Sequence, residues 1–112
     1  MRWEDVVTLG SKLPGVETGR SYNRPALKVR GKLLSRFLED GEQITLRATF
    51  AERDALVAAD PDSFVITEHH RGYEWVVVRL AAVPEPVLEE LLTESWRRAA
   101  PATLRKQWER SR

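Results

Sequence analysis

The chain contains no cysteine among its 112 residues. This absence excludes disulfide bonds, thiolate nucleophiles and every metal site that needs a cysteine ligand. Histidine is scarce too, because the two histidines of the sequence are the adjacent pair His69 and His70. No apolar run approaches the ~20 residues that a membrane-spanning helix needs, and the N-terminal segment lacks the long apolar stretch of a secretory signal. We therefore expect a cytoplasmic protein that contacts no membrane.

What the chain does contain is typical of one globular domain. Hydrophobic residues make up 42% of the sequence and charged residues 31%, a balance that favours a folded domain over a disordered chain. The length is that of one domain, and such a domain buries roughly two thirds of its unfolded surface. We expect a single domain over residues 1–112, in which residues 100–112 form a short helical tail.

The charge is small in total but unevenly distributed along the chain. The formal net charge is +1. Residues 12–36 carry +6, since seven basic groups stand there against Glu17, whereas residues 37–95 carry −9. Such a polarised surface suits an anionic partner. Long charged side chains that merely solvate helix faces would give the same pattern, so both interpretations stay open.

Hydrophobic periodicity predicts an alternation of helices and strands. Helical spacing of apolar residues predicts helices at 3–12, 51–61 and 83–100. Period-2 alternation and turn signals predict strands at 26–31, 33–38, 44–50, 63–67 and 74–80, with an irregular stretch at 15–25. Turns are expected at Gly31-Lys32 and at 39–43, and a hairpin loop at 68–73. The first three strands are expected to form an antiparallel meander.

This order predicts an α+β domain with the pattern α-β(3)-α-β(2)-α. Two layers are expected, in which helices cover one face of an antiparallel sheet. In the tail, Leu104 and Trp108 are four residues apart, so their side chains are expected to dock together.

The alternation also assigns the strand residues to the two faces of the sheet. The face toward the helices is expected to hold Leu27, Val29, Ile44, Leu46, Ala48, Val76, Val78 and Leu80. The open face is expected to gather Lys28, Arg30, Arg36, Arg47 and Arg79 around Trp75, with Lys32 at the first turn and Arg71 at the hairpin tip extending it like wings. Basic groups beside an aromatic ring suit phosphates and exposed bases. The sequence therefore predicts a nucleic-acid-binding surface.

Two other interpretations of the open face stay open. Basic side chains on a solvent-facing sheet also discourage edge-to-edge aggregation. In addition, the same face is expected to carry the apolar residues Leu34, Leu38, Trp75 and Val77. A half-apolar face of this kind is typical of a homodimer or of a chaperone-like contact with another protein. Because fold does not fix function, a role in binding or converting a small molecule also stays open.

The histidine pair is predicted to lie at a solvated hairpin tip and to take no part in chemistry. Neighbouring strand residues point to opposite sides of the sheet, and a zinc site needs three or four ligands. The sequence shows no nucleophile with a partner base and oxyanion donors, and its glycines form no nucleotide-binding motif. We therefore expect a non-enzymatic protein with no catalytic residues, no metal site and no cofactor.

Several segments taken together resemble a known family. They are LPGVETG, PALKVRGKL, DGEQITLR, ERDALVAADPDSF, HHRGYEWVVVRL and ESWRRAAPATLRKQW. Their order along nearly the whole chain is similar to that of the MmcQ/YjbR family of small bacterial proteins. The resemblance implies an α-β(3)-α-β(2)-α fold like that of secretion chaperones, a double-wing arrangement, DNA as the partner and no established catalytic residues. One departure is visible, because the family pattern has a single histidine followed by an aromatic residue where this chain has His69-His70.

Overall fold

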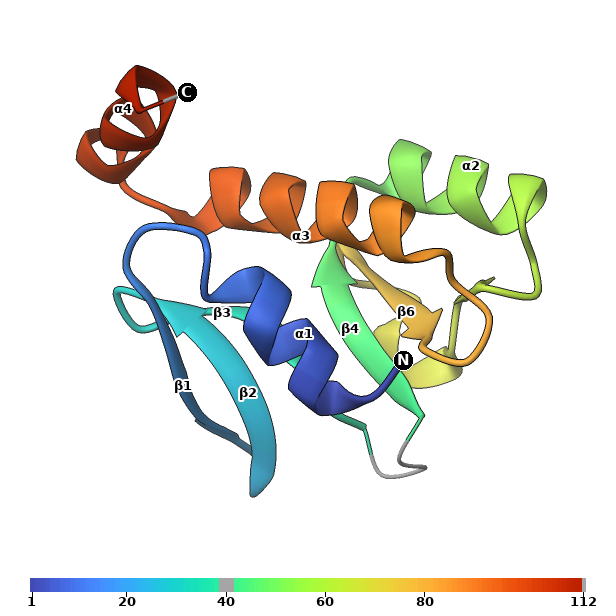
Figure 1. The fold of residues 1–112 in the computed structure, drawn as a ribbon. Coiled ribbons are helices and arrows are strands. Elements are labelled where there is room, and N and C mark those ends of the chain that lie inside the picture. Colours follow the sequence, from blue (N-terminus) through green and yellow to red (C-terminus); the bar gives the residue numbers. More distant parts are fainter. Residues whose placement is uncertain (39–41, 112) are drawn as a thin grey trace.

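Two small antiparallel sheets lie side by side under a layer of helices (Figure 1). The structure, a computed structural model, describes residues 1–38 and 42–111. Its helices are α1 (Trp3–Gly10), α2 (Phe50–Ala59), α3 (Glu85–Ala99), α4 (Ala102–Arg110) and the short 3₁₀ helix η1 (Glu68–His70). The first sheet has the order β1 (Val16–Ser21), β2 (Arg24–Val29), β3 (Lys32–Arg36), and the second has the order β4 (Gln43–Arg47), β6 (Trp75–Arg79), β5 (Phe64–Val65). No helix of the described residues is long and apolar enough to cross a membrane.

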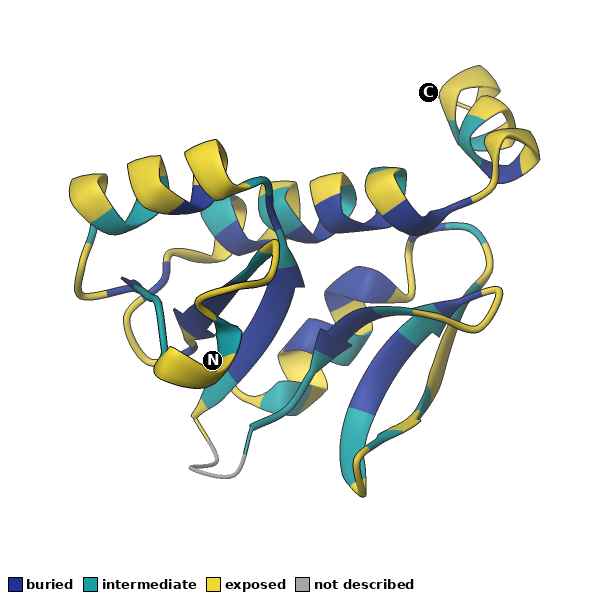
Figure 2. Ribbon diagram, turned by 180° about the vertical axis from the view of Figure 1, so that it is seen from behind, coloured by how far each residue is buried: buried dark blue, intermediate teal, exposed yellow. Residues whose placement is uncertain are grey.

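Helix α3 runs across both sheets and supplies much of the core (Figure 1). Figure 2 shows that its buried residues face the strands and that its exposed residues lie on the opposite side. Trp96 is the largest of the fully buried side chains. Its Nε1 donates a hydrogen bond of 2.8 Å to the carbonyl of Pro14, so burial leaves the indole N–H satisfied.

The structure confirms the predicted α+β class and the predicted inner face. Helices α1 and α3 fall within their predicted ranges, and α2 begins one residue before its range, at Phe50, which was predicted to end a strand. Strands β2 to β6 overlap the five predicted strands. Every residue assigned to the inner face is buried, namely Leu27, Val29, Ile44, Leu46, Ala48, Val76, Val78 and Leu80. Leu104 of α4 is buried and the Trp108 ring packs against Trp96 at 5.5 Å between centroids, so both side chains attach the tail to the rest of the domain. The turn predicted at 39–43 falls largely on residues 39–41, which lie outside the described residues.

The stretch at 15–25 is not irregular as predicted, because it contains strand β1 and the start of β2. Strand β1 is the edge of the first sheet, and its residues are half-buried or exposed, with none of them fully buried. It therefore lacks the apolar alternation from which a strand is recognised, and its pairing with β2 comes from backbone hydrogen bonds. Tyr22 and Asn23 form the tight turn between the strands, with φ of 50° and 62°.

Two residues predicted on the open face, Leu34 and Val77, are buried instead, with exposed fractions of 1% and 0%. In the β2–β3 pair, Leu27 stands opposite Ser35 and Lys28 stands opposite Leu33, which leaves Leu34 as an extra residue in β3. A bulge of this kind lets consecutive residues leave the strict two-face alternation. Leu34 therefore joins the core, while Arg36 remains on the face away from the helices.

The predicted meander is also wrong, because the chain changes sheet between β3 and β4. Among the described residues, the backbone joins the two strands through a bridge between Phe37 and Ile44 and a hydrogen bond of 2.9 Å from the Leu38 N–H to the Gln43 carbonyl. Side chains add further contacts at the junction. The buried Ser95 hydroxyl of α3 donates to the carbonyl of Leu34 at 2.9 Å and accepts from the backbone N–H of Arg47 at 3.2 Å. One hydroxyl thus connects α3, β3 and β4.

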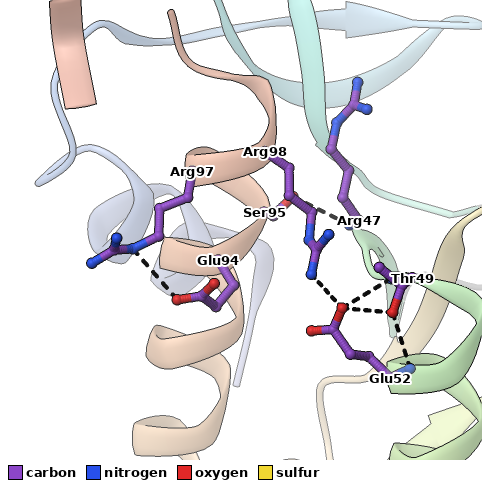
Figure 3. A network of polar contacts seen from close by, with 7 residues as sticks. All are labelled: Arg47, Thr49, Glu52, Glu94, Ser95, Arg97 and Arg98. Carbon is purple, nitrogen blue, oxygen red and sulfur yellow. Dashed lines mark hydrogen bonds and ion pairs between the residues drawn. The ribbon is translucent and has the colours of Figure 1, made fainter. Parts of the chain in front are cut away.

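A second polar network fixes α2 against the C-terminal turn of α3 (Figure 3). The Thr49 hydroxyl accepts a hydrogen bond of 3.1 Å from the backbone N–H of Glu52, and the Glu52 carboxylate accepts one from the backbone N–H of Thr49. This reciprocal arrangement is a capping box. The Glu52 carboxylate also pairs with Arg98, and the hydrogen bond from the Thr49 hydroxyl is the largest of the causes that lower the Glu52 pKa.

The two buried serines at the junction make a matched test of its stability. Ser95→Ala leaves the Leu34 carbonyl and the Arg47 N–H without their partner, so we expect the free energy of unfolding to fall by about 1–3 kcal/mol. The Ser35 hydroxyl is equally buried but has no hydrogen-bond partner among the described residues. Ser35→Ala therefore removes an unsatisfied group and should change stability by less than about 0.5 kcal/mol, or raise it. Urea unfolding of both variants, with an unchanged m-value, measures the difference, and equal losses would contradict the role of Ser95.

Candidate functional site

A groove lies over the sheet junction on the face away from α1 and α3. It has a volume of about 280 Å³ and is lined by the two histidines together with Tyr22, Leu33, Arg36, Thr45, Tyr73 and Trp75. These residues come from the β1–β2 turn, from β3, β4 and β6, and from the loop between β5 and β6. We call this feature the junction groove. None of the residues that line it, all of them in the described part of the chain, is acidic.

Arg47 lies next to the groove without lining it, and borders a neighbouring hollow that Glu74 and Arg98 also line. Its guanidinium lies 4.8 Å from the centre of the Trp75 ring, and its Nε donates a hydrogen bond of 2.7 Å to the carbonyl of Leu33. Burial lowers the Arg47 pKa from its ordinary value, but that value is so high that the side chain stays charged at neutral pH. In Figure 3 the Arg47 side chain extends away from Glu52 and Arg98. Arg47 thus ties β4 to β3 and holds a positive charge against an aromatic ring.

Arg36 provides a second pairing of cation and ring at the other end of the groove. Its guanidinium lies 5.3 Å from the centre of the Tyr22 ring, and its backbone N–H donates a hydrogen bond of 3.1 Å to the Thr45 hydroxyl. Tyr22 is 87% exposed. The sequence analysis missed Tyr22, although the Tyr-Asn pair was an available signal, since asparagine favours the positive φ of a two-residue hairpin turn.

The loop of residues 66–74 folds back over the sheet and does not project as a solvated tip. Arg53 of α2 is 7% exposed, and its Nη1 donates to the backbone carbonyls of Arg71 and Tyr73 at 2.9 and 3.2 Å. His69 is exposed as predicted, but His70 is half-buried in the junction groove. The prediction of a solvated histidine pair is therefore wrong for His70, because the buried Arg53 anchors the loop to α2.

His70 is held in a defined position within the groove. Its Nδ1 lies 2.8 Å from the Thr67 hydroxyl, and its ring meets the His69 ring edge-on at 4.9 Å between centroids. Burial lowers the His70 pKa from its ordinary value of 6.5, with smaller effects from His69 and Arg36 in the same direction. His70 is therefore neutral at pH 7. No three His, Asp or Glu side chains among the described residues are grouped so that they could hold a metal ion.

The structure brings three of the eight predicted site residues together. Arg36 and Trp75 line the groove, and Arg47 packs on Trp75. Lys28 stands opposite Leu33 in the β2–β3 pair, but its side chain lies by Gly19 of β1 and does not line the groove. It also faces Glu17 across the β1–β2 pair.

The other four predicted residues lie away from this cluster. Arg30 is exposed at the β2–β3 turn with φ of 49°, and Lys32 is exposed opposite Val29. Arg71 pairs with Glu68 at 2.9 Å. Arg79 lies four residues from Trp75 on β6, roughly 13 Å along the strand, and its Nη1 donates a hydrogen bond of 3.5 Å to the Asp62 carbonyl.

A larger hollow, of about 590 Å³, lies on the helix side of the molecule. It is bounded by α1, α3 and α4, and its lining includes Glu89, Glu90 and Glu94 beside Lys12 and Arg97. Arg97 is occupied by the protein itself, since it pairs with Glu94 at 3.4 Å and lies over the Trp108 ring. This hollow is mixed in charge, so the smaller junction groove is the better site for an anion.

Comparison with known proteins shows both sequence and structural relatives. A family model described as YjbR matches residues 11–98. An uncharacterised protein of Mycobacterium tuberculosis strain H37Rv is 32% identical over 117 aligned positions, which cover 91% of this chain and 91% of that protein. An uncharacterised protein of Mycobacterium bovis matches with the same identity and coverage.

Two solved structures share the fold. A Deinococcus radiodurans protein with a DUF419 domain superimposes with a TM-score of 0.76 at 21% identity, over 95% of this chain and 86% of that one. A DUF1801-family protein of Bacillus subtilis superimposes with a TM-score of 0.50 at 17% identity, over 83% of this chain and 72% of that one. At these identities the likeness concerns the arrangement of helices and strands alone.

The lowered pKa of His70 predicts how stability depends on pH. The folded protein takes up this proton less readily than the unfolded chain, whose histidine titrates near 6.5. The stability contributed by neutral His70 is therefore complete above pH 6.5 and is lost as the pH falls through 6.5 toward the lower folded pKa. We expect His70→Asn to flatten the slope of unfolding free energy between pH 7 and about pH 5, as measured by urea unfolding at several pH values.

The matched control for this prediction is His69→Asn. It keeps the burial of His70, which is the largest cause of the lowered pKa, so most of the wild-type slope should remain. If the unfolding free energy of His70→Asn depended on pH as steeply as that of the wild type, another group would be the cause of the pH dependence.

Proposed function

This chain belongs to the YjbR family, and we propose that it binds nucleic acid through the basic face around the junction groove. The observation that carries the proposal is the pairing of two guanidinium groups with aromatic rings at a groove whose described lining holds no carboxylate. Arg36 lies over Tyr22 and Arg47 lies over Trp75. Phosphate oxygens and planar bases are the two kinds of group that such an arrangement contacts well.

The chemistry of arginine supports an anionic ligand with flat rings. A guanidinium presents several N–H donors in one plane, and these match phosphate oxygens while the same plane stacks on aromatic rings. About two phosphate contacts, from Arg36 and Arg47, would make log K fall with log salt at a slope of about −1 to −2.

We propose further that the domain binds without catalysing a reaction. The Thr45 hydroxyl accepts a hydrogen bond from the backbone of Arg36, and His70 Nδ1 contacts Thr67. Neither histidine has a carboxylate partner among the groove residues that would orient it as a general base. This arrangement favours recognition of a ligand over chemistry on it.

A dimer or protein contact on the same face now has less support than the sequence suggested. That alternative depended on an apolar open face containing Leu34, Leu38, Trp75 and Val77. Leu34 and Val77 are buried and are unavailable to a partner, whereas Leu38 and Trp75 are half-buried. The lining of the junction groove is mainly aromatic and polar or basic, which favours nucleic acid.

A pair of arginine variants tests the proposal. Arg36→Gln removes one charge from the junction groove, whereas Arg110→Gln removes one from the exposed surface of α4. We expect Arg36→Gln to weaken binding roughly tenfold at low salt and to reduce the salt slope by about 1. Arg110→Gln should leave the affinity nearly unchanged. Fluorescence anisotropy of labelled oligonucleotides between low and physiological salt measures both quantities.

Two outcomes would count against the proposal. Absence of binding to single or double strands at low salt would remove it altogether. Equal losses in both variants would show that binding follows the total charge of the protein and not the groove.

A further inference from the structure

We propose that the junction groove holds one unstacked nucleobase, so that the protein prefers single strands to duplex. This inference depends on the nucleic-acid binding proposed above and adds the part of the ligand that is recognised. The observation behind it is the convergence of Tyr22, Tyr73 and Trp75, from three different segments, on one small groove.

The exposed aromatic residues are concentrated at this groove. Within the described residues, the large hydrophobic side chains that are exposed are Tyr22 at 87%, Tyr73 at 63% and Phe50 at 43%. Two of these three line the junction groove, although they are far apart in sequence. Trp75, half-buried between them and Arg47, adds a third ring. A cluster of rings left open to solvent is typical of a binding surface, and stacking on such rings is how proteins hold unpaired bases.

The backbone conformation of Tyr22 indicates that this residue serves through its aromatic ring and not through the stability of the turn. Tyr22 has φ of 50°, a left-handed conformation that bulky residues seldom adopt. The two-residue turn that it shares with Asn23 would be formed more readily by asparagine or glycine. An unfavourable residue held at a strained position is a sign that its side chain serves a function. Here the side chain is the ring that lies next to Arg36.

The groove is suited to a small planar group, and its rings can stack only on a base outside a duplex. Its volume of about 280 Å³ lies just under the range of about 300–1,000 Å³ that is usual for small-molecule pockets. In a duplex, both faces of each base are covered by neighbouring bases, so a ring of the protein can stack only on a base that has left the stack. The groove therefore selects single-stranded or locally opened nucleic acid.

The polar groups in the groove are suited to the edge of a base. The Thr45 hydroxyl oxygen accepts the Arg36 N–H, so its own proton remains available to donate. His70 uses Nδ1 at Thr67, which leaves Nε2 as its second ring nitrogen, and the ring is neutral at pH 7. Arg36 supplies charge at the Tyr22 end for the phosphate that follows the base. Neutral groups thus face the base and positive groups face the backbone.

The test compares three labelled probes of equal length by fluorescence anisotropy. They are a single-stranded oligothymidine, the same backbone carrying abasic sites at every position, and a duplex. We expect the single strand to bind at least roughly tenfold more tightly than the abasic strand and more tightly than the duplex. Equal affinity for all three probes would overturn the base-binding inference and leave the proposed phosphate contacts intact. Failure of all three to bind would overturn the proposed function itself.

The variant Tyr22→Asn separates the role of the ring from the stability of the turn. Asparagine suits the positive φ, so the variant should unfold at the same temperature as the wild type or higher. It should nevertheless lose roughly tenfold in affinity for oligothymidine and keep its affinity for the abasic strand. Phe50→Leu removes an exposed ring outside the groove and keeps an apolar side chain beside Arg53, which anchors the loop. It is the matched control and should bind normally.

Three results would overturn the role of Tyr22. One is unchanged binding of oligothymidine by Tyr22→Asn, and another is an equal loss in Phe50→Leu. The third is a wild-type dimer in light scattering that Tyr22→Asn dissociates, because the groove would then hold a second copy of this chain. If Tyr22→Asn does not fold, Tyr73→Ala replaces it, since Tyr73 is also exposed and lines the same groove.

Discussion

The Ser95 hydroxyl is the contact on which the arrangement of this protein depends. The strand ladder opens between β3 and β4, and at that point the hydroxyl joins the Leu34 carbonyl to the Arg47 N–H. Both partners would otherwise be polar groups at the edge of the core without a ladder neighbour, which is costly in a buried position. Because Ser95 belongs to α3, the helix that spans both sheets, the same contact sets the position of each sheet relative to the other.

The opening of the ladder also creates the candidate site. On the helix side, Ser95 and the core fill the junction, and on the other side the junction groove lies over it. The bulge at Leu34 contributes by sending this side chain into the core while Leu33 and Arg36 line the groove. A continuous six-stranded sheet would give flat neighbouring strands at this point instead of a hollow. The groove is thus a consequence of how two small sheets meet.

Arg47 belongs to both sides of this junction. Its backbone N–H and its Nε are used to hold β4 against α3 and β3, and its charge lies on the Trp75 ring at the edge of the groove. A binding residue that also makes structural hydrogen bonds is held in one orientation before a ligand binds, and this reduces the conformational entropy lost on binding. Arg53 holds the loop of residues 66–74 in one position in a similar way. It donates hydrogen bonds to two backbone carbonyls of that loop and so positions His70 and Tyr73.

Local pattern was sufficient for the elements and for the inner face of the sheets. The alternation of Ile44 and Leu46, or of Val76 and Val78, has a period of two that matches the pleat, and these side chains are buried where the pattern put them. Strand β1 was not predicted because the side chains of an edge strand are only partly buried and need not be apolar. Its pairing depends on backbone groups that every residue carries, so the pairing produces little pattern in the side chains.

The sequence by itself therefore determined the α+β class, the core and the basic character of Arg36, Arg47 and their neighbours, since hydrophobic period and charge belong to each segment alone. Only the tertiary structure decided where the sheet divides, that Leu34 and Val77 are buried, and that Tyr22 and His70 meet Trp75 around one groove. These features depend on a bulge, a buried hydroxyl and a loop anchored by Arg53. Each of these features depends on contacts between different segments of the chain, and the periodicity within one segment does not indicate such contacts.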